Sequence, residues 1–257
     1  GAQLKLEFVN TSGVNLDDDK RAQFIALSKE ISELSSEYST NMNSSNEILV
    51  LDENGAKGLS ENLKNTYKVA ENRYEIPVIN ATRLPVLNNA QSEETRKAYY
   101  IKYFNIGSEK NLEILDELIQ KRYELANLLG YESYAAYNLY PKMAKNPETV
   151  WKFLNDLIDR SKEKAKSDLQ ILQDLKKKDT QNILSTTLMD WDVDYYTNQI
   201  LKTQYQVDHE KIREYLPMEQ CLTGILNVYE TLFGLEFRKI EDASVWNKEI
   251  DMYEIYD

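Results

Sequence analysis

The chain has 257 residues, of which 42% are hydrophobic and 29% charged, and its net charge is −12. This composition is ordinary for a globular protein large enough to bury a core, as one large domain or two smaller ones. The acidic balance argues against a nucleic-acid partner, because phosphate binding needs clustered Lys and Arg. No apolar run reaches the roughly 20 residues of a membrane span, so we expect no membrane partner.

Cys221 is the single cysteine, which excludes a disulfide within the chain. The sequence has no signal-peptide pattern and opens with Gly1 instead of Met, so we expect the natural N-terminus to be missing. A cytoplasmic location is expected, and an organellar or periplasmic one stays open if a targeting segment was removed.

The first part of the chain predicts short extended segments and one long helix. Leu4, Leu6 and Phe8 alternate with charged residues, as in a small edge strand. Acidic residues at 17–19 begin an amphipathic helix that continues to about Met42. Residues 48–51 then predict a strand or extended segment.

Residues 52–58 read as a turn; they resemble the start of a calcium loop but lack its Glu at the twelfth position, so we favour a plain turn. Ser60 predicts the cap of a helix through Tyr67, and residues 74–85, with two prolines, predict extended chain. Ser92 predicts the cap of the next helix, which breaks at Gly107.

The stretch from 128 to 147 predicts a corner between long helices. Upstream, six residues recur at helical spacing and predict one buried face: Leu112, Leu115, Leu118, Arg122, Leu125 and Leu129. Gly130 is placed where a left-handed cap belongs, and Asn146 with Pro147 predicts the start of a third helix after a short second one.

The longest pattern runs from Asn146 to about Lys178. Its predicted buried stripe consists of Trp151, Leu154, Leu157, Ile158, Ala165, Leu169 and Leu172. A coiled-coil arm is the other interpretation of this stretch. Further on, Asp190 or Asp192 predicts the cap of a helix through Tyr205, and Met218 to Leu232 predicts a helix that ends at Gly234. Alternation after Gly234 predicts strands that begin a small sheet.

The residues offer little for catalysis. A zinc site needs three or four ligands, mostly His and Cys, and the chain has one of each, His209 and Cys221. We expect His209 in a solvated loop and Cys221 among core residues. A nucleophilic triad built on the single His lacks any accompanying glycine-rich motif. Three aspartates, Asp190, Asp192 and Asp194, suggest paired carboxylates, although caps and helix-dipole partners are the commoner role.

Tyrosine is unusually frequent, with 18 residues. Such side chains can line a peptide-binding channel, because each offers a flat apolar face and a polar tip. The simpler interpretation is packing at the margin of the core, and we favour it.

The order of several short motifs resembles the family of zinc metallopeptidases that includes thimet oligopeptidase, oligopeptidase A and peptidyl-dipeptidase. The resemblance covers roughly residues 20–257 and rests on residues 34–41, 58–62, Arg96 with Tyr99 and Tyr100, 128–135, 142–147, 191–196, 214–217, 232–234 and 245–246. Each motif is weak alone, and their shared order makes chance an unlikely explanation.

The resemblance implies a mainly α fold: an elongated multi-helix lobe of a two-lobed, channel-type metallopeptidase, with a small β-sheet beginning near the C-terminus. It implies residues 1–187 as a helical lobe and 188–257 as a helical segment leading into the sheet of the catalytic lobe. The family holds zinc with an H-E-x-x-H helix and a later Glu, none of which is present here.

We therefore expect this chain to be a middle portion that forms one channel wall, with short peptides as ligands. It carries no assignable catalytic, cofactor-binding or metal-binding residue, and we expect it to bind no zinc and to be inactive alone. The complete enzyme would contain zinc, and the missing catalytic half or a second chain would be a partner. Two alternatives stay open: an inactive relative that acts as a peptide- or protein-binding module, and an unrelated helical scaffold.

Overall fold

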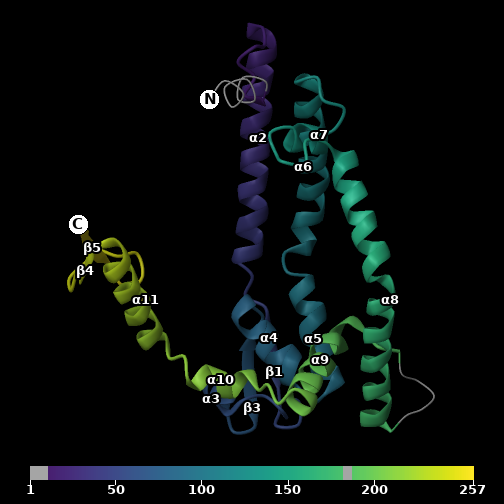
Figure 1. Cartoon of the computed structure of the whole chain (residues 1–257), viewed down its shortest axis with the longest axis vertical. Coiled ribbons are helices and arrows are strands. Elements are labelled where there is room, and N and C mark those ends of the chain that lie inside the picture. Colours follow the sequence, from purple (N-terminus) through teal and green to yellow (C-terminus); the bar gives the residue numbers. More distant parts are fainter. Residues whose placement is uncertain (1–10, 182–186) are drawn as a thin grey trace. The chain divides into compact units, whose positions relative to one another are not determined.

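The computed structural model describes residues 11–181 and 187–257 (Figure 1). Within these ranges the chain forms ten helices and five strands, so the predicted mainly helical fold with a small sheet near the C-terminus is confirmed. The chain divides into two compact units, Gly1–Gln199 and Ile200–Asp257. The predicted boundary between residues 187 and 188 stays a prediction, and the strand predicted at residues 4–8 lies outside the described residues.

The first unit opens with a long helix, α2 (Asp18–Asn43). The helix start predicted at the acidic residues 17–19 is confirmed, and the Asp17 side chain caps the helix by accepting the Lys20 N–H at 2.9 Å. The elements that follow are β1 (Ile48–Leu51), α3 (Glu61–Tyr67), β2 (Lys68–Ala70), β3 (Arg73–Pro77), α4 (Asn80–Asn89), α5 (Glu93–Phe104), α6 (Ser108–Leu128), α7 (Tyr134–Leu139), α8 (Pro147–Thr180) and most of α9 (Asp190–Gln204).

The core of this unit lies on a three-stranded antiparallel sheet with the order β1-β3-β2. In β1, Leu49 and Leu51 point into the core while the residues between them face outward, the period of two that a strand imposes. Helices α4 and α5 contribute to the same core, and the buried residues are Leu49, Leu51, Ala56, Leu59, Tyr74, Ile76, Val78, Val86, Leu87, Ala90 and Tyr99.

The extended chain predicted for residues 74–85 is wrong from residue 80 onward, where α4 begins and contains Pro85. A proline inside a helix costs about 3 kcal/mol, because it lacks an N–H and crowds the preceding turn. The helix offsets this cost by burying Val86 and Leu87 completely, each contributing about 1.5–3 kcal/mol. Buried Thr82 also contacts the Tyr99 hydroxyl at 2.8 Å.

Helices α2 and α6 pack along one another. The side chain of buried Asn111, near the start of α6, connects them: it bonds to the Tyr38 carbonyl at 3.1 Å and to the Asn41 side chain at 2.9 Å. The buried face of α6 contains Asn111 together with Ile114, Leu118 and Leu125. The predicted face is therefore wrong for Leu112 and Leu115, which are exposed.

The corner between α6 and α8 forms as its sequence predicts. Gly130 has φ +85°, and the Tyr131 N–H bonds to the Ala126 carbonyl at 2.9 Å, closing the end of α6. Helix α7 follows, and the Asn146 side chain then caps α8 by accepting the Thr149 N–H at 2.8 Å.

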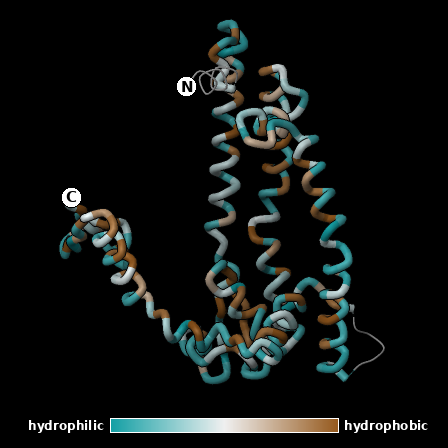
Figure 2. The backbone as a smooth tube through the Cα atoms, in the orientation of Figure 1, coloured by the Kyte–Doolittle hydropathy of each residue, from teal (hydrophilic) through white to brown (hydrophobic). Residues whose placement is uncertain are grey.

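The predicted buried stripe of α8 is wrong. Trp151 is 63% exposed and Ile158 56%, and Lys176 is the one buried residue of Pro147–Thr180. Figure 2 shows apolar residues recurring along this helix. The helix packs on α7 at its start, and its last turns are joined to the rest of the unit through polar contacts. Helical periodicity reports which face is apolar, but burial also requires a partner for that face.

The second unit contains α10 (His209–Glu214), α11 (Met218–Phe233) and an antiparallel pair, β4 (Glu236–Lys239) with β5 (Tyr253–Tyr256). The predicted end of α11 at Gly234 is confirmed, with φ +71° at the glycine. The apolar side chains of α11 stay largely exposed, including Met218, Ile225 and Leu232. Among the described helices, none combines the length and the hydropathy needed to cross a membrane.

We predict that Gly58→Ala destabilises the first unit more than Gly130→Ala. Both glycines have positive φ, at +87° and +85°, where a Cβ costs about 1–2 kcal/mol. A Cβ at Gly58 would also lie 2.2 Å from the Asn89 carbonyl oxygen, whereas a Cβ at Gly130 meets nothing within 4 Å. Urea unfolding followed by circular dichroism measures both, and equal losses would contradict this account.

Candidate functional site

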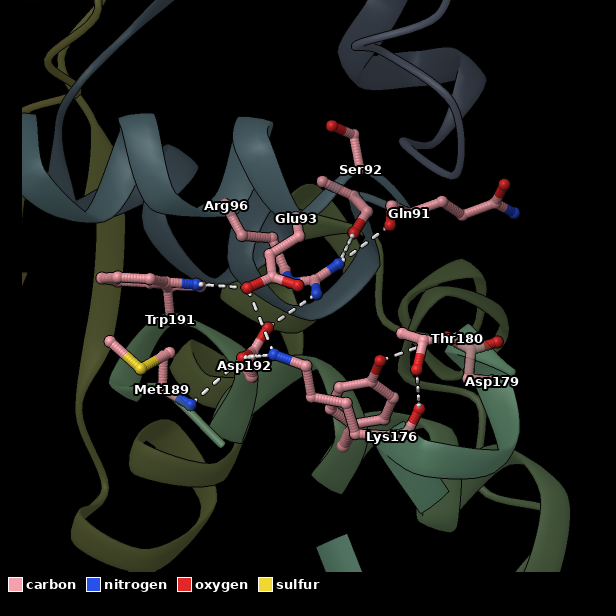
Figure 3. A network of polar contacts seen from close by, with 12 residues as sticks. Gln91, Ser92, Glu93, Arg96, Lys176, Asp179, Thr180, Met189, Trp191 and Asp192 are labelled. Carbon is pink, nitrogen blue, oxygen red and sulfur yellow. Dashed lines mark hydrogen bonds and ion pairs between the residues drawn. The ribbon is translucent and has the colours of Figure 1, made fainter. Parts of the chain in front are cut away.

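Asp192 is the centre of a buried polar network in the first unit (Figure 3). It lies in the first turn of α9, where its Oδ2 accepts the Met189 N–H at 3.1 Å. The prediction that Asp190 or Asp192 is the cap residue is wrong, because both lie inside α9. Asp192 instead reaches back from the first turn to the residue before the helix. Unlike an ordinary cap residue it is completely buried, with an exposed fraction of 0%.

Two cations bind the Asp192 carboxylate, one on each oxygen. Arg96 of α5 donates to Oδ1 at 2.8 Å, and Lys176 of α8 donates to Oδ2 at 2.6 Å. Lys176 also donates to the Glu93 carboxylate at 3.1 Å and to the Thr187 carbonyl at 3.2 Å. Glu93 in turn accepts from the indole nitrogen of Trp191 at 3.3 Å. Three helices thus meet at one carboxylate.

Arg96 is held on every side. One terminal nitrogen donates to the carbonyls of Ala90 at 2.8 Å and Gln91 at 3.0 Å, while the other binds Asp192. The guanidinium also lies over the ring of Tyr195, 4.2 Å from its centroid, where the ring quadrupole attracts a cation. Its Nε, which has no hydrogen bond, is the one unsatisfied nitrogen of the side chain.

The charges of this network cancel, since two cations face two carboxylates. Both oxygens of Asp192 are already occupied by strong donors, so the carboxylate has no role left as a base or a metal ligand. A buried ion pair adds little net stability because desolvation opposes the attraction, but it fixes geometry once formed. The network is best described as a clamp that joins α5, α8 and α9.

The other sequence-predicted residues are not brought together. Asp190 contacts the Tyr100 hydroxyl at 3.4 Å, and Asp194 lies 3.9 Å from Arg83, so the three aspartates do not form paired carboxylates. His209 is exposed, as expected, but it starts α10 instead of lying in a loop. Cys221 is half-buried on α11 and not in a core.

The donors of this chain do not fit a catalytic zinc. Across residues 11–181 and 187–257, no three side chains of His, Cys, Asp or Glu are grouped as metal ligands would be. Such a site needs about three protein ligands in a tetrahedral arrangement with one open position.

Four tyrosines gather at the corner between α6 and α7. The rings of Tyr131 and Tyr137 are 5.5 Å apart, those of Tyr131 and Tyr140 5.8 Å, and those of Tyr134 and Tyr137 5.6 Å. All four are half-buried, as the packing interpretation predicts. The guanidinium of Arg122 lies 5.4 Å from the centre of the Tyr134 ring, however, which places a cation beside this cluster.

Two clefts lie beside the end of α2. The larger, of about 530 Å³, is mostly polar and includes the Lys102–Glu47 ion pair, whose atoms are 2.6 Å apart. The smaller, of about 390 Å³, is lined by apolar side chains such as Met42, Ile79 and Phe104. Neither contains a group of residues arranged for catalysis.

Sequence reasoning missed the clamp. Arg96 and Tyr99 are three residues apart on α5 and both are buried, so the signal was a charged residue on an apolar helix face. Lys176 lies beside Lys177 and Lys178 near the end of α8, where cations commonly complement the helix dipole. Only its distant partners, Glu93 and Asp192, distinguish it from them.

Comparison with known proteins gives a consistent result. The sequence profile of "Peptidase family M3" matches residues 86–257. Saccharolysin of Saccharomyces cerevisiae is 34% identical over 258 residues, covering 95% of this chain and 36% of that protein. Mitochondrial intermediate peptidase of Yarrowia lipolytica is 32% identical, covering 96% and 32%. Oligopeptidase A of Escherichia coli is 29% identical, covering 96% and 38%. The chain thus spans about a third of the length of these relatives.

We predict that Asp192→Asn lowers the free energy of unfolding by about 3–5 kcal/mol, because it leaves two buried cations without their carboxylate. Asp190→Asn, two residues earlier, should change it by less than about 0.5 kcal/mol, as is usual at an exposed position. Urea unfolding of both variants measures the difference. Similar losses for the two would show that the clamp contributes nothing specific.

We also predict that stability falls as the pH rises above about 10. Burial, and then the charge of Asp179, raise the pKa of Tyr196 above its ordinary value of 10.0. The unfolded chain therefore loses this proton first, which costs about 1.4 kcal/mol of stability per pH unit for each such group. Tyr196→Phe should make the alkaline decline shallower, whereas exposed Tyr205→Phe should not. Identical slopes would contradict this assignment.

Proposed function

The chain belongs to peptidase family M3, and from this premise we propose that it is part of a zinc-dependent metallo-oligopeptidase that cleaves short peptides, in which it forms a wall of the substrate channel. The observation that carries the proposal is the match to three relatives over 95% or more of this chain. Because the chain spans about a third of those relatives, the activity is proposed for the complete enzyme and not for this portion alone.

The role as a wall is supported by the character of α8. This helix has 34 residues and keeps an apolar stripe exposed over most of its length, while its last turns are fixed by the Asp192 clamp. An apolar helix face of this kind is suited to contact with peptide or with further polypeptide. The tyrosines around α7 add aromatic surface with polar tips at the start of the same helix.

Zinc would be held by polypeptide outside this chain, since the donors described here do not fit it. The metal would polarise the scissile carbonyl and activate a water molecule in the complete enzyme. The residues of this chain would contribute substrate contact and the fixed positions of α5, α8 and α9.

A second candidate function is an inactive relative that binds peptides or a protein partner. The observation that favours it is the absence of a metal-ligand group among the described residues. It makes the opposite prediction in an activity test, because such a module would fail to support catalysis when combined with a working metal site.

The compartment stays a prediction. A cytoplasmic location was expected from the sequence. An organellar location stays open as well, since two relatives are named as a mitochondrial intermediate peptidase and, in Arabidopsis thaliana, an organellar oligopeptidase A. We also propose short peptides as the ligands of the channel wall.

A chimera tests the proposal. This chain would replace the aligned segment of saccharolysin, and turnover of a quenched short peptide would be measured. We expect chelator-sensitive cleavage by the chimera, because the substituted part would support a metal site supplied by the host. The same peptide and a zinc determination on the 257-residue chain alone should show no turnover and no bound zinc.

Two controls make the result specific. Unmodified saccharolysin fixes the activity of the host, and circular dichroism establishes that the chimera is folded. A folded chimera without turnover would favour the inactive binding module. Chelator-sensitive turnover by the isolated chain would show that its own residues hold the metal and would overturn the proposed division of roles.

A further inference from the structure

Arg122 differs from the other seven arginines of the chain. Each of those pairs with a carboxylate within 4.0 Å, and the pairs are Arg21–Asp18, Arg73–Glu75, Arg83–Asp194, Arg96–Asp192, Arg160–Asp156, Arg213–Glu210 and Arg238–Glu236. Arg122 forms no ion pair or hydrogen bond through its side chain with any residue in 11–181 or 187–257. The chain carries 43 acidic and 31 basic residues, so carboxylates are not scarce.

The position of Arg122 makes this lack of a carboxylate unusual, because part of the side chain is removed from water. It lies on α6, four residues from Leu118 and Ala126 and three from Leu125, all of which are buried. The side chain is half-buried, and its Nε is buried without a hydrogen bond. Buried charges in proteins are usually paired, because leaving water is expensive for an ion.

Arg96 is a similar arginine for which the chain supplies hydrogen-bond acceptors. Both guanidinium groups lie over a tyrosine ring, Arg96 at 4.2 Å from Tyr195 and Arg122 at 5.4 Å from Tyr134, and both have an unsatisfied Nε. The terminal nitrogens of Arg96 reach a carboxylate and two backbone carbonyls. Those of Arg122 have no such acceptors in the described part of the chain.

The surroundings of Arg122 supply further donors. The hydroxyls of Tyr131 and Tyr134 form no hydrogen bond within the described residues, whereas the Tyr137 hydroxyl donates to the Thr11 carbonyl at 3.0 Å. Burial, and then the neighbouring tyrosines, raise the pKa of Tyr131, which keeps its hydroxyl protonated as a donor. A cation and hydroxyl donors without acceptors together describe a site for an anion.

We propose that Arg122, with the hydroxyl of Tyr134, binds the carboxylate of a short peptide. A guanidinium group presents two parallel N–H donors that match the two oxygens of a carboxylate. This inference rests on the proposed function, since it assumes that short peptides are the ligands. It assigns them an anchor at the corner between α6 and α7.

The experiment compares one tetrapeptide in two forms, with a free C-terminal carboxylate and with a C-terminal amide. Calorimetry measures the binding of each to the 257-residue chain. We expect the acid to bind about tenfold more tightly, as for one charge-assisted contact. The net charge of −12 repels an anion, so the general field of the protein cannot produce this preference.

Variants of Arg122 and Tyr134 test whether these residues produce the preference for the peptide acid over the amide. Arg122→Gln should abolish it, Arg122→Lys should retain part of it, and Tyr134→Phe should reduce it. Arg160→Gln is the matched control, because it removes the same charge from an exposed arginine whose partner is Asp156 on its own helix. Circular dichroism establishes that each variant is folded, and the comparison of acid with amide in the unmodified chain does not depend on the variants.

The outcomes separate this inference from the proposed function. Equal binding of the two peptides, or a preference that survives in folded Arg122→Gln, would overturn the anchor while leaving peptide binding intact. If neither peptide binds, the anchor and the proposed contact of this chain with peptides are overturned together.

Discussion

The burial of one carboxylate, that of Asp192, determines how three helices of the first unit are joined. Arg96 and Lys176 approach its two oxygens from α5 and α8, and the side chain itself lies in the first turn of α9, where it accepts the Met189 N–H. None of these groups could be buried alone, since an uncompensated ion in the interior costs several kcal/mol. The three helices must therefore meet in one arrangement. Directional charge contacts, more than apolar burial, fix the end of α8.

This mode of attachment explains why α8 keeps its apolar stripe exposed. A helix that is positioned by packing buries its stripe, as α6 does through Ile114, Leu118 and Leu125. Helix α8 buries Lys176 instead, and Trp151 and Ile158 remain available for contact. Holding a long helix by its ends leaves the apolar side chains along its length exposed, as the proposed channel wall would need.

Features set by neighbouring residues could be predicted from the sequence, and features set by distant residues could not. The helix start at residues 17–19, the caps at Ser60, Ser92 and Asn146, and the left-handed Gly130 depend on a few adjacent residues, and all are confirmed. The helix through Pro85 depends on a core assembled from strands and helices far apart in sequence. Whether the apolar stripe of a helix is buried depends likewise on another element that packs against it, and the periodicity of the helix sequence does not specify that element.

The candidate site was likewise only partly predictable from the sequence, as the two arginines that lie over tyrosine rings show. Arg96 and Arg122 both occupy apolar helix faces, a pattern visible in the sequence. The pattern does not distinguish an arginine that completes a clamp from one that awaits a ligand, because the difference lies in the acceptors that folding brings to each. Asp192 is 96 residues from Arg96 in the chain. A charged residue on an apolar face therefore predicts that a counter-charge is needed, and only the structure reveals whether the chain supplies it.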